Sequence, residues 1–125
     1  MRISMVSIHV TEPAHAYRFY TDVLGFETTL ALPESDVFVV SAPGQDVGLL
    51  LEPSDDALGD TYRSALRAAG VPVLVMSTDT LFSDIERLRA NGVHFVCDVF
   101  RDASGEAINF SDSVGNLIQL HQGAS

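Results

Sequence analysis

The chain has a single cysteine among its 125 residues, so it has no means of forming an internal disulfide. It also has no CxxC pair and no cluster of cysteine and histidine, which excludes the usual structural zinc sites. Its longest apolar segments, residues 71–76 and 47–51, are far shorter than the ~20 residues of a membrane-spanning helix. The strand-like pattern begins at residue 2, so we expect no signal peptide. We therefore expect a cytoplasmic protein without a membrane partner.

Basic residues are also scarce. Lysine and arginine together number 7 against 17 acidic residues, which gives a formal net charge of −10. Because this charge repels a phosphate backbone, we expect no nucleic-acid partner. Apolar residues nevertheless make up 46% of the chain, and a domain of this length buries roughly two-thirds of the surface of its unfolded chain. The composition predicts one compact domain, residues 1–125.

The first half of the chain changes from a strand pattern to a helical one. Residues 2–10 alternate between two faces, which is typical of a strand. Apolar side chains then recur at helical spacing over residues 13–24, and Gly25 ends this helix. Three further strands are predicted at residues 26–32, 37–42 and 47–52.

The second half repeats this order. It begins with a strand at residues 71–78 and a helix at residues 81–91, which Gly92 ends. Three further strands are predicted at residues 93–100, 106–110 and 116–122. Met5 and Gly25 are 20 residues apart, and Val73 and Gly92 are 19 apart. The pattern predicts an α+β fold of two tandem βαβββ modules, residues 1–53 and 71–122, with a linking helix at residues 54–70.

Three segments resemble one known family. They read FYTDVLGF at residues 19–26, LLEP at residues 50–53 and DSVGNLIQL at residues 112–120. In their order and spacing the sequence resembles the vicinal oxygen chelate superfamily, which includes glyoxalase I, bleomycin-resistance proteins and extradiol dioxygenases. The resemblance implies two modules that curl into a mixed sheet with an open cup, which holds a small molecule or a metal. It also implies a homodimer.

The enzymes of this superfamily hold a metal with one residue from each of four strands. Carried over to this sequence, the four positions fall on Met5, Gly48 or Leu49, Val73 and Gln119. A thioether is a weak ligand for zinc, nickel, iron or manganese, and glycine, leucine and valine offer no donor. We therefore expect no metal at this site and no other cofactor.

A second metal hypothesis uses His9, Glu52 and His121, which together resemble the facial triad of non-haem iron sites. His9 lies ~13 Å along its strand from the position that the resemblance implies, and His121 lies ~7 Å from its own. Ligands must converge on one ion, so these unequal displacements weigh against a shared site. The simpler interpretation is a polar His9 inside the cup and an exposed Glu52.

The predicted cup has a mostly apolar lining with a few polar groups. Its residues are Met5, Ser7, His9, Val73, Ser77, Phe110, Leu117, Gln119 and His121. Such a lining is typical of small-molecule pockets. The alternative is that these side chains only fill the interior of a small curled sheet. Cys97 lies on the same face of the predicted strand as Val93 and Phe95, so its thiol is predicted to pack against apolar neighbours.

The sequence thus favours a binding protein that holds a small, partly apolar molecule without metal, much as bleomycin-resistance proteins sequester an antibiotic. The missing ligands weigh against an enzyme. The alternative is a metal-dependent lyase, isomerase or dioxygenase of the glyoxalase type, with a divalent transition metal as cofactor. A third hypothesis is a scaffold domain that keeps the fold without the site.

Overall fold

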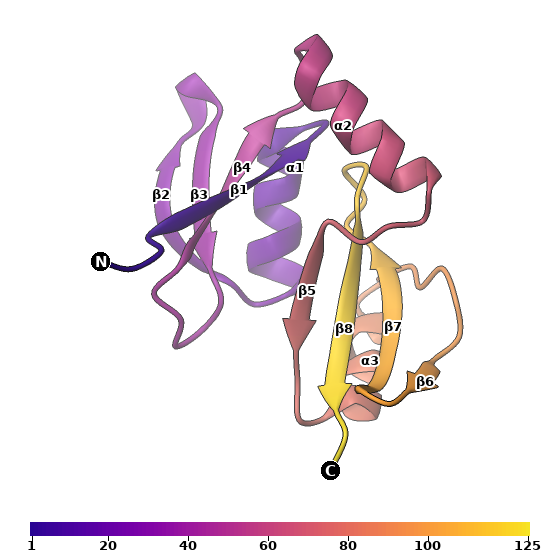
Figure 1. Cartoon of the computed structure of the whole chain (residues 1–125). Helices are drawn as coiled ribbons and strands as arrows, with labels where there is room; N and C mark the ends of the chain where they lie inside the picture. Colours follow the sequence, from indigo (N-terminus) through magenta and orange to yellow (C-terminus); the bar gives the residue numbers. More distant parts are fainter.

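The computed structural model describes all residues, 1–125, as an α+β protein with two four-stranded mixed sheets (Figure 1). Sheet A has the strand order β1-β4-β3-β2, and sheet B has the order β5-β8-β7-β6. In each sheet the first strand runs parallel to the last, and the other neighbours are antiparallel. Both sheets therefore have the topology expected of a βαβββ module.

The first half of the chain contains β1 (Met5–Val10), α1 (Pro13–Arg18), the π-helical turn η1 (Phe19–Val23), β2 (Glu27–Leu32), the 3₁₀ turn η2 (Pro33–Ser35), β3 (Val37–Ser41) and β4 (Gly48–Pro53). Helix α2 (Ala57–Ala68) links the halves across one end of the molecule (Figure 1). The second half contains β5 (Leu74–Ser77), α3 (Leu81–Ala90), β6 (Phe100–Asp102), β7 (Gly105–Ser111) and β8 (Leu117–Gly123).

The predicted first helix is present but changes geometry along its length. It begins as α-helix, and its last turn widens, so that the Leu24 amide donates to the Phe19 carbonyl five residues earlier (3.1 Å). Gly25 then adopts a φ of +80°, a left-handed conformation that glycine adopts without a steric penalty. This turn sends the chain back along the sheet as β2.

The strand predicted at residues 93–100 is wrong. Only an isolated bridge joins Phe95 to Phe110, and regular pairing with β7 begins at Phe100. Between these points the Asn109 amide donates to the Cys97 sulfur (3.4 Å) instead of to a backbone carbonyl, which interrupts the ladder. Because no strand forms here, the Cys97 side chain is exposed, and the prediction that it packs in the interior is wrong.

One hydrophobic core serves both halves of the chain. It combines residues that α1, η1 and sheet A supply, such as Tyr20 and Leu51, with residues that α3 and sheet B supply, such as Leu88 and Ile118. Helices α1 and α3 lie on the same side of their sheets, behind them in the view of Figure 1. No helix is both long enough and apolar enough to cross a membrane.

A buried hydrogen-bond network also joins the halves. The fully buried carboxylate of Asp112 accepts hydrogen bonds from the Tyr20 hydroxyl (3.0 Å) and from the side-chain amide of Asn116 (2.9 Å). The same amide donates to the His9 carbonyl in β1 (2.8 Å). Burial raises the pKa of the Asp112 carboxyl. Burial, together with the nearby Asp112 charge, also raises the pKa of the Tyr20 hydroxyl.

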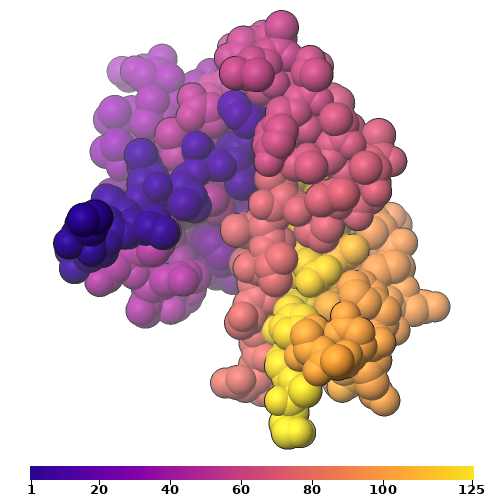
Figure 2. Space-filling model, in the orientation of Figure 1, coloured from indigo at the N-terminus to yellow at the C-terminus, as the bar shows by residue number.

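The sheet faces that point away from α1 and α3 are open. In β1, Ile8 and Val10 are buried, so the alternate side chains point to the opposite face. Exposed apolar residues on these two faces are Met5, Leu30 and Leu32 of sheet A and Val75 and Phe100 of sheet B. Atoms of β1 and β8 lie at the surface in the space-filling view (Figure 2). We call these surfaces open face A and open face B.

Candidate functional site

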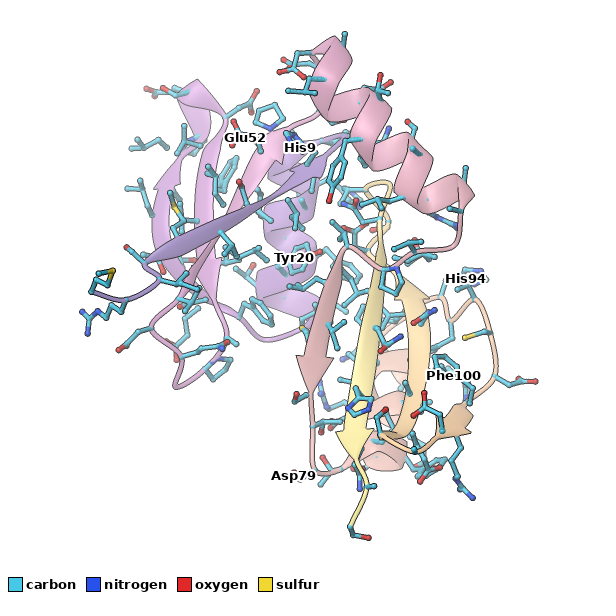
Figure 3. The ribbon with its side chains drawn as sticks, viewed as in Figure 1. His9, Tyr20, Glu52, Asp79, His94 and Phe100 are labelled. Atoms are coloured by element: carbon cyan, nitrogen blue, oxygen red, sulfur yellow. The ribbon has the colours of Figure 1, made fainter.

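Three of the predicted lining residues lie on open face A. The register of β1 with β4 pairs Met5 with Gly48, Ser7 with Leu50 and His9 with Glu52. Residues paired across neighbouring strands point to the same face of a sheet. Open face A is therefore mostly apolar, with its polar groups gathered near the carboxyl end of β1. Figure 3 shows His9 and Glu52 there, close to α2.

Other predicted lining residues lie on open face B. Gln119 and His121 alternate with buried residues of β8, and Ser77 pairs with His121. The Gln119 side-chain amide donates to the Asn109 side-chain oxygen (3.3 Å). Leu117 is buried, and its carbonyl accepts a hydrogen bond from the Val73 amide (2.9 Å). This face thus offers polar groups from β5, β7 and β8.

Phe110 does not line the cup, and this part of the prediction is wrong. Its neighbour Asn109 pairs with Gln119 on open face B, so Phe110 points to the opposite side of β7. There it is fully buried in the core, with its ring 5.8 Å from that of Phe95. The alternation of β7 was apparent in the sequence, but the identity of its buried face was not.

A short line of polar groups runs along the edge of open face B. The Ser104 hydroxyl donates to the Asp102 carboxylate (2.5 Å) and lies 3.1 Å from the His121 ring nitrogen Nε2. These hydrogen bonds hold the pKa of Asp102 below its usual range, and His121 acts in the same direction. Since Ser104 gives its proton to the carboxylate, His121 does not act on it as a base. The geometry is that of a hydrogen-bonding surface and not of an activated nucleophile.

The linking helix covers His9 at the end of open face A. The His9 ring lies edge-on to Tyr62 of α2, with 6.4 Å between ring centroids. Its Nδ1 atom is buried and has no hydrogen-bond partner. A Cβ atom added to Gly59 of α2 would lie 2.7 Å from this nitrogen, so the helix passes His9 at a distance that only glycine allows. A glycine inside a predicted helix was the one sequence signal of this contact.

We expect Gly59→Ala to lower the free energy of unfolding, by about 1 kcal/mol or more, because the new methyl group overlaps the His9 ring. In a His9→Ala background the loss is expected to be smaller by about 1 kcal/mol, because the overlap with the ring is gone and only the 3.0 Å approach of the new methyl group to the Asp56 carboxylate remains. Urea denaturation of the four proteins measures this difference. Equal effects in both backgrounds would contradict the contact.

A cavity of about 460 Å³ lies between the two halves of the chain. Its walls include Val6 of β1, Leu74 and Met76 of β5, and Leu88 of α3. Of the predicted lining residues only Ser77 borders it. Sequence reasoning missed this inter-module cavity because its walls come from elements whose relative placement no local pattern reveals. A second cavity of about 340 Å³, to which mostly polar residues contribute, lies beside α1.

Comparison with known proteins identifies the fold. Residues 2–120 match the Glyoxalase/Bleomycin resistance protein/Dioxygenase superfamily. The chain belongs to this superfamily. The uncharacterized protein YurT of Bacillus subtilis (strain 168) is 30% identical over an alignment of 126 positions, which covers 98% of this chain and 99% of that protein.

Solved structures show the same fold. UcmS2 superposes with a TM-score of 0.81 at 26% identity and covers 97% of both chains. TnmS3, an antibiotic binding protein from Streptomyces sp. CB03234, superposes with a TM-score of 0.76 at 23% identity. That comparison covers 99% of this chain and 97% of TnmS3. The neighbours of this superfamily member therefore include at least one binding protein.

The metal site that the superfamily resemblance implies does not fit these residues. Met5 faces Gly48 across β1 and β4, and Val75, not Val73, faces Gln119 across β5 and β8. A thioether, a hydrogen atom, an isopropyl group and one neutral amide do not make a ligand set for a divalent transition metal. Leu49, the alternative position, is buried in the core.

The second metal hypothesis is also not supported within one chain. His9 and Glu52 are neighbours on open face A, whereas His121 lies on open face B and contacts Ser104. No group of three or more histidine, cysteine or acidic residues is arranged to hold a metal ion. The structure thus brings two of these three residues together and leaves the third on the other sheet.

Proposed function

We propose that this superfamily member binds a small, partly apolar molecule, without a metal, in a cup completed by two copies of the chain. The observation that carries the proposal is the pair of open faces, where exposed apolar side chains surround a few hydrogen-bonding groups. Ligand sites typically combine such an apolar lining with sparse polar groups. One chain leaves most of both faces uncovered, and a homodimer would place open face A of one copy opposite open face B of the other.

The polar groups on the two faces suggest how a ligand would be oriented. Ser7 and His9 would contact it from open face A, and Gln119 and His121 from open face B. Both histidines and the glutamine offer a donor and an acceptor, so they suit a planar molecule with carbonyl or hydroxyl groups. The fold neighbour TnmS3 is an antibiotic binding protein, which is consistent with such a ligand.

In this proposal, residues 1–53 and 71–122 act as two modules, each of which supplies one wall of a cup, and residues 54–70 only link them. The net charge of −10 gives no attraction for nucleic acid. A cytoplasmic protein of this kind would hold a small molecule as its partner, and a second copy of the chain as its assembly partner.

The proposal predicts that planar aromatic compounds bind to chelator-treated protein. A compound that binds only the folded state stabilises it by about 2.7 kcal/mol at 100 times its dissociation constant. The chain has three methionines, Met1, Met5 and Met76, so methyl NMR gives three signals that methionine-to-leucine variants can assign. We expect ligands that raise the melting temperature to shift the Met5 signal.

The outcome that contradicts the proposal is also measurable. If iron, manganese or zinc raises the melting temperature of the wild type but not of His121→Ala, the histidines bind metal and the enzyme hypothesis takes precedence. A compound screen in which binding appears only after metal is restored leads to the same conclusion. His94→Ala serves as the matched control, because His94 is an exposed histidine outside the predicted cup lining, at the cavity beside α1.

A further inference from the structure

The inter-module cavity lies mainly on the helix side of the sheets and reaches the proposed cup only at its border, where Gly48, Val75 and Ser77 contribute to its wall. Leu74 and Met76 pair with Ile118 and Leu120, which are buried in the core beneath sheet B. Val6 likewise points to the same face of β1 as the buried residues Ile8 and Val10, opposite to the face on which Met5 lies. The cavity is therefore a partly open space between the two modules of a single chain, and most of its wall is distinct from the cup.

The size and lining of the cavity suit a small organic molecule. Its volume of about 460 Å³ falls within the range of about 300 to 1,000 Å³ that is usual for ligand sites. Apolar side chains form most of the wall, among them Phe26, Leu49, Leu74, Met76, Leu88 and Leu120. An aromatic or branched hydrocarbon body would cover this surface and replace water there.

The polar side chains at the rim are unequally engaged. The Asp84 carboxylate accepts hydrogen bonds from the hydroxyl groups of Thr78 and Thr80. Arg87, one turn further along α3, lies 3.6 Å from Asp84 and keeps 55% of its side chain exposed. Because the guanidinium has five N–H donors and makes only this one long contact, most of its donors are free. The Asp84 carboxylate, by contrast, already accepts these two hydrogen bonds from hydroxyl groups.

The free donors of Arg87 and the occupied acceptors of Asp84 favour an anionic ligand over a cationic one. A cationic group would bind Asp84 poorly, because this carboxylate already accepts hydrogen bonds from two hydroxyl groups and because the nearby Arg87 would repel a positive charge. An anionic group would find a guanidinium that can hold it with two parallel hydrogen bonds. The local chemistry thus favours an anion, even though the net charge of the whole chain is negative.

We propose that the inter-module cavity is a second small-molecule site, which binds an aromatic carboxylate with its ring system against the apolar wall and its carboxylate against Arg87. The site lies within one chain, whereas the proposed cup needs two copies. The two share residues at their border, among them Val75 and Ser77 of open face B.

Two probes with the same ring system test the proposal. 2-Naphthoate and 2-naphthylmethanol are titrated into the full-length protein, with the assigned methionine methyl signals as the readout. We expect both probes to shift the Met76 signal, which reports on this cavity, and naphthoate to bind about tenfold more tightly than the alcohol. A shift of the Met5 signal alone, or no shift of Met76, would overturn the proposal.

Substitution of the arginine separates charge recognition from apolar contact. Arg87→Gln is expected to weaken naphthoate about tenfold and to leave the affinity for naphthylmethanol unchanged. Arg67→Gln, an exposed arginine on α2, is the matched control and should alter neither affinity. Equal losses for both probes in Arg87→Gln, or the same loss of naphthoate affinity in Arg67→Gln, would show that Arg87 does not recognise the carboxylate.

Discussion

Asp112→Ala is expected to lower the free energy of unfolding by about 3 to 5 kcal/mol, because it removes the acceptor at the centre of a buried network. The carboxylate accepts from the Tyr20 hydroxyl, the Asn116 side chain, and the backbone amides of Val114 (3.0 Å) and Asn116 (2.9 Å). Each buried donor left without a partner costs about 1 to 3 kcal/mol, and the new cavity adds to this. Urea denaturation measures the loss.

Tyr20→Phe provides the graded comparison. It deletes one hydroxyl and leaves three donors on Asp112, so we expect a loss of only about 1 to 1.5 kcal/mol. If the two substitutions cost the same, the tyrosine contact and not the carboxylate holds the halves together. If neither costs more than a typical surface change, the network contributes nothing measurable to stability.

The same carboxyl has a defined effect on the pH dependence. Burial raises the pKa of folded Asp112 above its ordinary value of 3.8. The folded state therefore binds this proton more tightly than the unfolded state does. Its contribution to stability is fully present below the unfolded pKa and is lost as the pH rises through the folded pKa. The stability of wild type relative to Asp112→Asn should accordingly fall with rising pH across that interval.

Much of the fold was predictable because its periodicities are local. The alternation of residues 2–10 and the helical spacing up to Gly25 each arise within one element, and they recur in the second half. The error at residues 93–100 has a different origin. Its apolar alternation is real, but the irregular hydrogen bonds near Cys97 depend on how β7 is placed beside it.

The candidate site was only partly predictable, because a strand pattern defines two faces without saying which is buried. In β7, Ile108 and Phe110 share a face, and only the position of α3 shows that this face is the core. Spacing also misaligned one metal position. Gly25 follows Met5 by 20 residues, and the similar spacing of 19 before Gly92 led to Val73, whereas the strand register selects Val75, only 17 residues before Gly92. The slip of two residues kept the correct face of the strand.

The proposed dimer predicts a large effect of a charge placed on open face A. Met5 lies on β1, which pairs only with β4 and so has a free edge, and 51% of its surface is exposed in one chain. Buried in a dimer, a glutamate at this position would be desolvated without a partner and would add to the repulsion between two chains of charge −10. We expect Met5→Glu to raise the dimer dissociation constant at least about 100-fold, a change of about 2.7 kcal/mol.

Sedimentation equilibrium distinguishes a dimer of twice 13.5 kDa from a single chain. Phe82→Glu is the matched control, because Phe82 is an equally exposed apolar residue on α3, away from both open faces, and the wild-type mass should be retained. Wild-type and Met5→Glu proteins of identical mass would contradict the dimer. A monomeric Met5→Glu protein should lose the ligands of the cup, which needs two chains. It should still bind naphthoate, because the inter-module cavity lies within one chain.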